Sequence, residues 1–530
     1  MIGRSKSKTT STSSSSTTKA SGPVSAPRGP RPGPRGWVGR GRGPAGYVQA
    51  ADEWRGTTVQ VCGLWPFAAG TGSPMVGVPI GRNMVSGSTL CCDPVSWFQR
   101  GNLISQPSMF VLGRPGLGKS TIVRRMALGL AGYGVQPMVL GDLRPDYVDL
   151  IEALGGQVLR LGPGRGSLNV LDSSEAKAAA DRLTGGARGA LLADAHEVRA
   201  TMVSSLITIL RKAPPTDREE SILDRALAVL DERHVGTPVL ADLLQVIRDA
   251  PADVRQVAID HGSDDRYRQL TEGLEATLAG MTHGGRFGGI FTQQTTAPMR
   301  RDRPVVFDVS SIDDGQMDLQ AAALLASWST GFGAINVSNR LADAGLEPRR
   351  HYFVVLDELW RALRAGRGLV DRVDTLTRLN RKWGVGQAMI SHTMSDLLAL
   401  PSPEDRMKAR GLVERSGMVV CGGLPAAEME MLRSAVSVSR AEEEMLTSWT
   451  DPPAWDPDGG HESAPPGRGK FLVKVGGRPG IPVQVKLTSV EATMNDTNKL
   501  WHTISRTGKV SDLPPVDEVL DAVEAAEGVS

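Results

Sequence analysis

Short apolar runs recur along most of the chain and are separated by longer stretches in which apolar residues return every three or four positions. The short runs have the length of buried strands, and the longer stretches have the period of helices with one apolar face. Alternation of the two is typical of a parallel sheet covered by helices. We predict the strands at residues 109–112, 138–141, 158–161, 304–309, 351–358, 385–391 and 418–421.

The pattern changes from residue 174 to about residue 300, where Ala- and Leu-rich helical periodicity dominates. Thr216 and Glu219 have the spacing of a capping box, which marks the start of a helix. The apolar residues after it fall on one helix face: Ile222, Leu223, Ala226, Leu227 and Leu230. These features predict an all-α insertion within an α/β core.

The remaining patterns divide the rest of the chain. Short apolar pieces between Gly and Pro, such as 58–64 and 88–92, predict small strands before the core, and 470–475 with 481–487 resemble a hairpin. The resulting segments are a tail (1–46), a β-rich lead-in (47–107), the core in two parts (108–173 and 301–504), the all-α insertion (174–300) and an acidic C-terminal helix or tail (505–530). That last segment either docks on the body or stays solvated.

Charge is unevenly distributed along the 530 residues. Residues 1–46 hold nine Lys and Arg and no acid, so the net charge of +2 leaves about −7 for the remainder. This segment is Ser/Thr-rich and then Pro/Gly/Arg-rich, a composition that predicts disorder. Its charge suits DNA or an acidic lipid surface, and a solvated tether is the alternative.

Cysteine usage and hydropathy favour a cytoplasmic protein. The four cysteines, Cys62, Cys91, Cys92 and Cys421, lack the spacing of a zinc site or a disulfide framework. No apolar run approaches the roughly 20 residues that span a bilayer, and we find no apolar core of a secretory signal. Any work at a membrane is therefore expected to be peripheral.

The strongest motif follows the first predicted core strand. Its residues fit G-x-x-x-x-G-K-[ST], with a strand before and a helix after: Gly113, Arg114, Pro115, Gly116, Leu117, Gly118, Lys119, Ser120 and Thr121. Backbone N–H groups and the helix N-terminus would face phosphates. Lys119 would reach the β- and γ-phosphates and Ser120 would ligate Mg²⁺. A glycine-rich turn without a ligand is the alternative.

An acidic pair ends a later strand. The apolar run 352–356 delivers Asp357 and Glu358 to its carboxyl end, which is the Walker B arrangement. Asp357 would hold Mg²⁺ through its waters, and Glu358 would polarise the attacking water. Carboxylates that only cap the next helix are the structural alternative. The segment 142–147 places two further carboxylates and an arginine at the end of another strand, at the edge where parallel sheets bind ligands.

Two sets of polar residues are further candidates. Arg378 and Arg381 share a helix face, and either could stabilise the charge that develops on the γ-phosphate. A solvated basic face explains them equally well. His392 follows the strand after the acidic pair and could sense the γ-phosphate by donating a hydrogen bond, or could simply be exposed.

The order of these motifs resembles the TraC-like conjugative-transfer ATPases of type IV secretion systems, within the HerA/FtsK superfamily. The likeness covers about residues 80 to 500. It rests on the phosphate loop and on the segments 142–147, 167–172, 285–291, 307–310, 356–360 and 391–397.

The resemblance implies a RecA-like P-loop NTPase core, a mainly parallel sheet with helices on both faces, and an all-α insertion. It implies ATP hydrolysis with Mg²⁺, commonly in hexamers, and membrane-channel components as partners. Lys119, Ser120, Asp357 and Glu358 match the family motifs, and Arg381 matches more loosely. The family usually has Gln where His392 stands, and its long members place a large domain before the phosphate loop.

We therefore expect an ATP-hydrolysing motor of a conjugation or type IV secretion apparatus, at the inner face of the cell membrane. A DNA translocase of the coupling-protein or FtsK type is one alternative, and the basic tail supports it. A nucleotide-gated assembly scaffold with little turnover is another alternative, and the presence of Glu358 argues against it.

Overall fold

The computed structural model describes residues 72–282, 287, 289–366, 369–378, 383–400, 402–453, 455–456, 461–462 and 465–494. These residues belong to the compact unit Gly70–Ser530. The predicted tails 1–46 and 505–530 and the predicted strand 58–64 lie outside the described residues.

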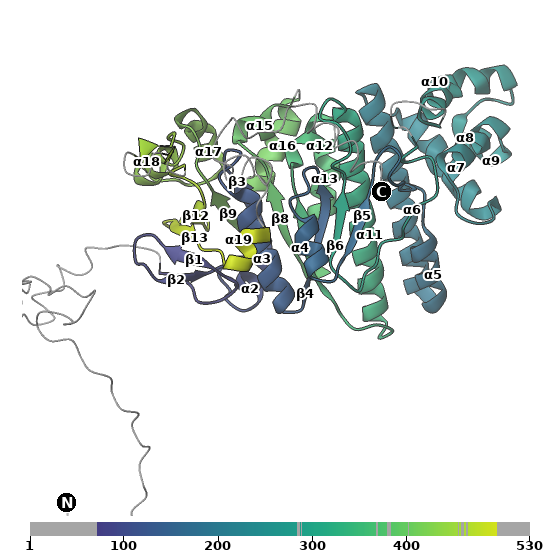
Figure 1. Cartoon of the computed structure of the whole chain (residues 1–530). Helices are drawn as coiled ribbons and strands as arrows, with labels where there is room; N and C mark the ends of the chain where they lie inside the picture. The colour runs from purple at the N-terminus through teal and green to yellow at the C-terminus, as the bar shows by residue number, and fades with distance from the viewer. Residues whose placement is uncertain are drawn as a thin grey trace, which may run out of the picture. The chain divides into compact units, whose positions relative to one another are not determined.

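The described residues form one large sheet of eleven strands, in the order β2-β1-β13-β12-β9-β3-β8-β7-β4-β6-β5. The run from β9 to β5 is parallel throughout (Figure 1). Its strands are β9 (Met418–Cys421), β3 (Ser108–Leu112), β8 (Val385–Ile390), β7 (His351–Leu356), β4 (Val135–Asp142), β6 (Val305–Asp308) and β5 (Gln157–Arg160). Each of the seven strands predicted from the sequence is present. The strand predicted at 351–358 ends earlier, at Leu356, because Glu358 has left-handed backbone angles.

The remaining four strands form an antiparallel flank beside β9. They are β12 (Lys470–Lys474), β13 (Ile481–Val485), β1 (Pro79–Asn83) and β2 (Thr89–Cys91). The predicted hairpin is confirmed as β12–β13, and β12 pairs with β9. β1 pairs with β13, where a Cβ on Gly81 would lie 2.0 Å from the carbonyl oxygen of Gln484. Only glycine allows so close an approach, so this position requires it.

Side chains of the central strands alternate between two apolar layers. On β7, Phe353 and Val355 enter one core, whereas Tyr352, Val354 and Leu356 enter the other. The first core is closed by α2 (Pro94–Gln99), α3 (Lys119–Gly132) and α4 (Val148–Ala153). The second is closed by α11 (Met317–Asp343), α12 (Leu359–Arg364), α13 (Leu369–Arg378), α15 (Met394–Leu398) and α16 (Pro403–Glu414). Helices on both faces of a mainly parallel sheet confirm the predicted fold class.

A group of helices separates β5 from β6 in the chain. They are α5 (Ser174–Arg182), α6 (Gly185–Arg211), α7 (Asp217–Arg233), α8 (Leu240–Asp249), α9 (Ala252–Ala258) and α10 (Asp264–Thr282) (Figure 1). The predicted capping box is present, with Thr216 and Glu219 bonded reciprocally at the start of α7. The five apolar residues predicted on one face of this helix are all buried. The all-α insertion is thus confirmed as part of the fold.

The chain after β9 folds into η1 (Ala426–Glu428), α17 (Met429–Ala435), α18 (Arg440–Ser448), the small pair β10 (Trp455–Asp456) and β11 (His461–Glu462), and α19 (Ser489–Met494). α19 lies beside α3 (Figure 1), where Arg124 donates 2.9 Å to the carbonyl of Met494 and Arg125 pairs with Glu491. Within the described ranges, no helix combines the length and the apolar character needed to cross a bilayer.

Candidate active site

The candidate residues gather at the carboxyl edge of the parallel strands. The phosphate loop follows β3, the segment 142–147 ends β4, the acidic pair follows β7, and His392 follows β8. β8 lies between β3 and β7, and β4 lies on the other side of β7. Neighbouring strands therefore bring together groups that are far apart in the sequence, as expected for ligand sites of open parallel sheets.

Glycines give the phosphate loop its curvature. Gly116 (φ 80°) and Gly118 (φ 98°) adopt backbone angles that disfavour side chains. Gly118 is the N-cap of α3, so the helix begins directly after it. The loop is anchored from both neighbouring strands, because the N–H of Gly113 donates 2.8 Å to the carbonyl of His392 and that of Arg114 donates 3.0 Å to Gly423.

Lys119 is directed at the loop itself. Its side chain belongs to the buried set, at 8% exposure, and Nζ donates to the carbonyls of Gly113 (2.8 Å) and Arg114 (3.3 Å). Burial lowers the pKa of Lys119, and the charges of Asp357 and Glu358 act in the opposite direction. The acidic pair therefore lies within electrostatic reach of the phosphate loop.

Ser120 is linked to the loop after β4. Its hydroxyl donates a 2.8 Å hydrogen bond to Oδ2 of Asp146, whose backbone carbonyl accepts from Arg124. Burial raises the pKa of Asp146, and the Ser120 hydroxyl opposes that rise. Sequence reasoning placed this carboxylate at the sheet edge and gave it no role. Its position two residues before α4 carries no signal for contact with Ser120.

The carboxylate of Asp357 accepts two hydrogen bonds. Oδ1 accepts 2.8 Å from the backbone N–H of Glu358, and Oδ2 accepts 3.2 Å from the hydroxyl of Tyr147. Burial and the adjacent charge of Glu358 raise the pKa of Asp357 to about 6. Such a carboxylate favours a partner of positive charge, such as a divalent cation.

Glu358 is held by side chains from two elements. Trp360 Nε1 donates 2.5 Å to Oε2, and His392 Nε2 lies 3.3 Å from Oε1. Burial alone would raise the pKa of Glu358, but the hydrogen bond and charge of His392 shift it below its usual value. Glu358 occupies the N-cap position of α12 without a side-chain capping bond, so capping does not account for it. His392 contacts this carboxylate, and its predicted sensor role stays a prediction.

The arginine predictions are not tested. Arg378 is the last residue of α13, and its side chain lies outside the described residues together with Arg381. Both stay predictions.

The donor set fits a Mg²⁺-bound polyphosphate. The curved loop at the start of α3 offers N–H groups, and the amine of Lys119 donates to two carbonyls of the loop. Ser120 and Asp357 supply a hydroxyl and a carboxylate, which are the hard oxygen ligands that Mg²⁺ prefers. These groups can hold a nucleoside triphosphate beside the carboxylate of Glu358.

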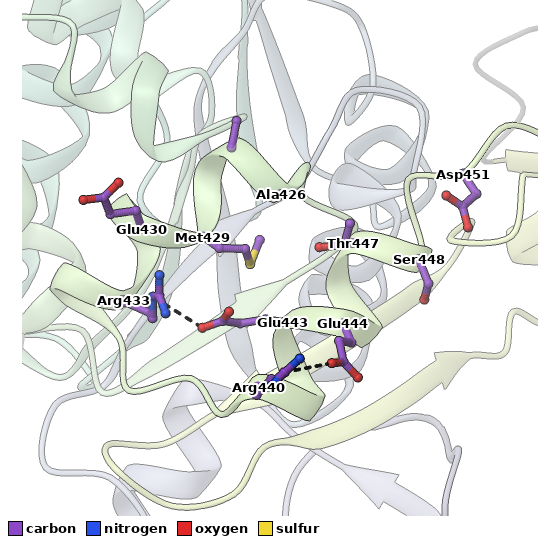
Figure 2. Close-up of a pocket in the computed structure, with 11 residues that line it drawn as sticks. Ala426, Met429, Glu430, Arg433, Arg440, Glu443, Glu444, Thr447, Ser448 and Asp451 are labelled. Carbon is purple, nitrogen blue, oxygen red and sulfur yellow. Dashed lines mark hydrogen bonds and ion pairs between the residues drawn. The ribbon is translucent and has the colours of Figure 1, made fainter.

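A cavity of about 700 Å³ lies elsewhere, between η1, α17 and α18 (Figure 2). None of the phosphate-site residues lines it. Four of its charged groups are paired, Arg433 with Glu443 at 3.4 Å and Arg440 with Glu444 at 3.2 Å. The cavity therefore has no part in the phosphate site.

Known proteins similar to this chain are found by comparing structures and not by comparing sequences. The chain matches no protein-family model and no curated protein by sequence. VirB4 of Thermoanaerobacter pseudethanolicus is similar at 18% identity and a TM-score of 0.54, over 80% of this chain and 100% of that one. The plasmid coupling protein TrwB in complex with ADP and Mg²⁺ matches at 14% identity and 0.45, over 77% and 90%. The likeness to VirB4 confirms the expected RecA-like P-loop fold.

Proposed function

We propose that this chain is an ATPase that powers a conjugation or type IV secretion apparatus. The observation that carries the proposal is the meeting of a complete phosphate loop with Asp357 and Glu358 at one edge of a sheet. The VirB4-like fold and the order of motifs along the sequence support the choice of apparatus.

The binding step uses the loop and the first turn of α3. Loop N–H groups and the helix N-terminus hold the phosphates, and Lys119 exchanges the carbonyls of Gly113 and Arg114 for phosphate oxygens. Ser120 and Asp357 would hold Mg²⁺. An ion bound there would supply positive charge that offsets the charge developing on the phosphates.

The hydrolytic step uses Glu358. Its lowered pKa keeps the carboxylate ionised, so it can accept the proton of a water that attacks the γ-phosphorus. The bond from the γ-phosphorus to the bridging oxygen breaks, and ADP and phosphate leave. From their place in the sequence, Arg378 and Arg381 are the candidates to stabilise the transferred phosphoryl group, in their own subunit or in a neighbouring one.

The finer assignments follow from the family resemblance. The motor assembles as a homo-oligomer, a hexamer by analogy, on the cytoplasmic side of membrane-channel components. The nine basic residues in 1–46 give it a means of binding DNA electrostatically.

The test is steady-state ATPase activity of the purified chain. Lys119→Ala and Glu358→Gln should each lower kcat by about 100-fold or more, because each removes a group that acts on the developing charge or on the water. Lys486→Ala and Glu444→Gln, at exposed positions, are the matched controls and should leave kcat unchanged.

Two outcomes would change the proposal. Full multiple-turnover activity in Glu358→Gln would remove Glu358 from the mechanism. Strong stimulation by single- or double-stranded DNA, lost as salt is raised, would favour a DNA translocase over a secretion motor.

A further inference from the structure

Both carboxylate oxygens of Glu358 are occupied by ring nitrogens. Trp360 reaches Oε2 from the first turn of α12, and His392 reaches Oε1 from the end of β8. The two rings lie 6.2 Å apart between centroids and are tilted by 46°. The carboxylate is therefore fixed from two directions, and the nearer donor is the indole.

The indole is itself held in place. The guanidinium carbons of Arg361 and Arg364 lie 4.9 Å and 4.6 Å from the ring centroid, within the range of cation–π attraction. Arg364 also donates to Asp396, at 3.0 Å to its carbonyl and 3.2 Å to its carboxylate. Arg361 donates 3.0 Å to Asp314. Trp360 is thus a rigid donor rather than a freely rotating surface side chain.

The backbone of Glu358 is also constrained. Its φ of 50° and ψ of 38° place it in the left-handed region, where side-chain-bearing residues are uncommon. Such angles persist when surrounding contacts enforce them, and they cluster at functional sites. Each carboxylate oxygen has two lone pairs, so each can accept a water proton while it keeps its ring donor.

We propose that Trp360 is a positioning residue for Glu358. Its indole N–H holds Oε2 so that the carboxylate faces the attacking water, and Arg361 and Arg364 keep the indole in that orientation. This inference rests on the proposed function, in which Glu358 accepts the water proton. Trp360 itself touches neither nucleotide nor water in this scheme.

Trp360→Phe tests the proposal, because it keeps an aromatic ring for the two arginines and removes the N–H donor together with one ring of the indole. The loss of one hydrogen bond to a charged group predicts a fall in kcat of about 10- to 100-fold, with KM for ATP changed by less than about twofold. Trp328→Phe is the matched control. Trp328 is buried in α11, and its indole N–H has no hydrogen-bond partner among the described residues, so kcat should not change.

A double variant separates positioning from a general structural role. In Glu358→Gln the carboxylate is already gone, so adding Trp360→Phe should lower kcat no further. An additional tenfold loss in the double variant would overturn the proposal. Equal kcat in Trp360→Phe and the unmodified chain would also overturn it, while the loss in Glu358→Gln would still stand and keep the proposed function.

A third variant distinguishes the loss of the N–H donor from misfolding. Trp360→His retains a ring N–H at this position and should keep several-fold more activity than Trp360→Phe at the same thermal midpoint. If Trp360→His and Trp360→Phe lose activity equally, or if kcat follows the thermal midpoint across the variants, the N–H donor has no special role and the inference fails.

Discussion

The hydroxyl of Ser120 and the carboxylate of Asp146 form a 2.8 Å hydrogen bond between the first turn of α3 and the loop after β4. Ser120 is the residue that the motif assigns to Mg²⁺, so its hydroxyl is already directed toward an acidic group. Asp146 therefore belongs with the residues that orient the metal ligand.

Replacing Asp146 by Asn tests this relationship. The amide oxygen can still accept from Ser120, but the negative charge is lost. We expect the Mg²⁺ concentration for half-maximal turnover to rise about tenfold, as is typical when a partner of a metal ligand is altered. The measurement is ATPase rate against Mg²⁺ at saturating ATP. Asp181→Asn, a charge change on the exposed surface of α5, should leave that concentration unchanged, and an equal shift in both variants would contradict the prediction.

Lys474 and Glu442 provide a stability prediction. Lys474, 3% exposed, donates 3.0 Å and 3.1 Å to the two oxygens of Glu442, which also caps α18. Lys474→Met leaves Glu442 buried without its cation. We expect the free energy of unfolding to fall by about 3 kcal/mol, which urea denaturation measures. Lys470→Met, on the same strand and less buried, should cost less than about 1 kcal/mol.

The same pair offers an internal check. Because Glu442→Gln removes the buried charge, the double variant with Lys474→Met should recover part of the loss. A double variant as unstable as the sum of the two single ones would show that the pair acts through packing alone.

His196 makes the insertion pH-sensitive. Its ring lies 3.8 Å from Asp231 and 2.8 Å from Asp224, and these two carboxylates raise the pKa of His196. The pKa of His196 is thus higher in the folded chain than in the unfolded chain, where it is about 6.5. The protonated ring therefore stabilises the fold fully at pH values below about 6.5, and this contribution is lost as the pH rises through the folded-state pKa.

We therefore expect stability to decline by up to about 1 kcal/mol between pH 5.5 and pH 8.5 through this group. Thermal midpoints of the unmodified chain and of His196→Gln would be compared across that range. The difference between them should be largest at the acidic end, and a constant difference would refute the assignment.

The sequence predicts most of the parallel core because burial on both faces demands continuous apolar runs. β7 is an example, since Tyr352 to Leu356 leave no polar position for a solvent-facing side. The capping box at Thr216 and the glycines of the phosphate loop are local signals, and they are visible without knowledge of the fold.

Pairings between distant segments were not predictable from pattern. The small strands before residue 107 were expected, but nothing in them indicates that β1 joins β13 some 400 residues later. The contacts of Asp146 with Ser120 and of Trp360 with Glu358 depend on strand order and on side-chain direction. Those properties are set by the assembled sheet rather than by local sequence.

The pairing of β1 with β13 has a mechanical consequence. The start of β1 lies beside the end of β13, because Gly81 pairs with Val485. Tension that pulls residues before Pro79 away from residues after Val485 therefore acts on one end of an antiparallel ladder, whose bonds run across the strands and open one after another. Such a load would separate β1 from β13 one hydrogen bond at a time, and β12 and β9 lie between that pair and β3.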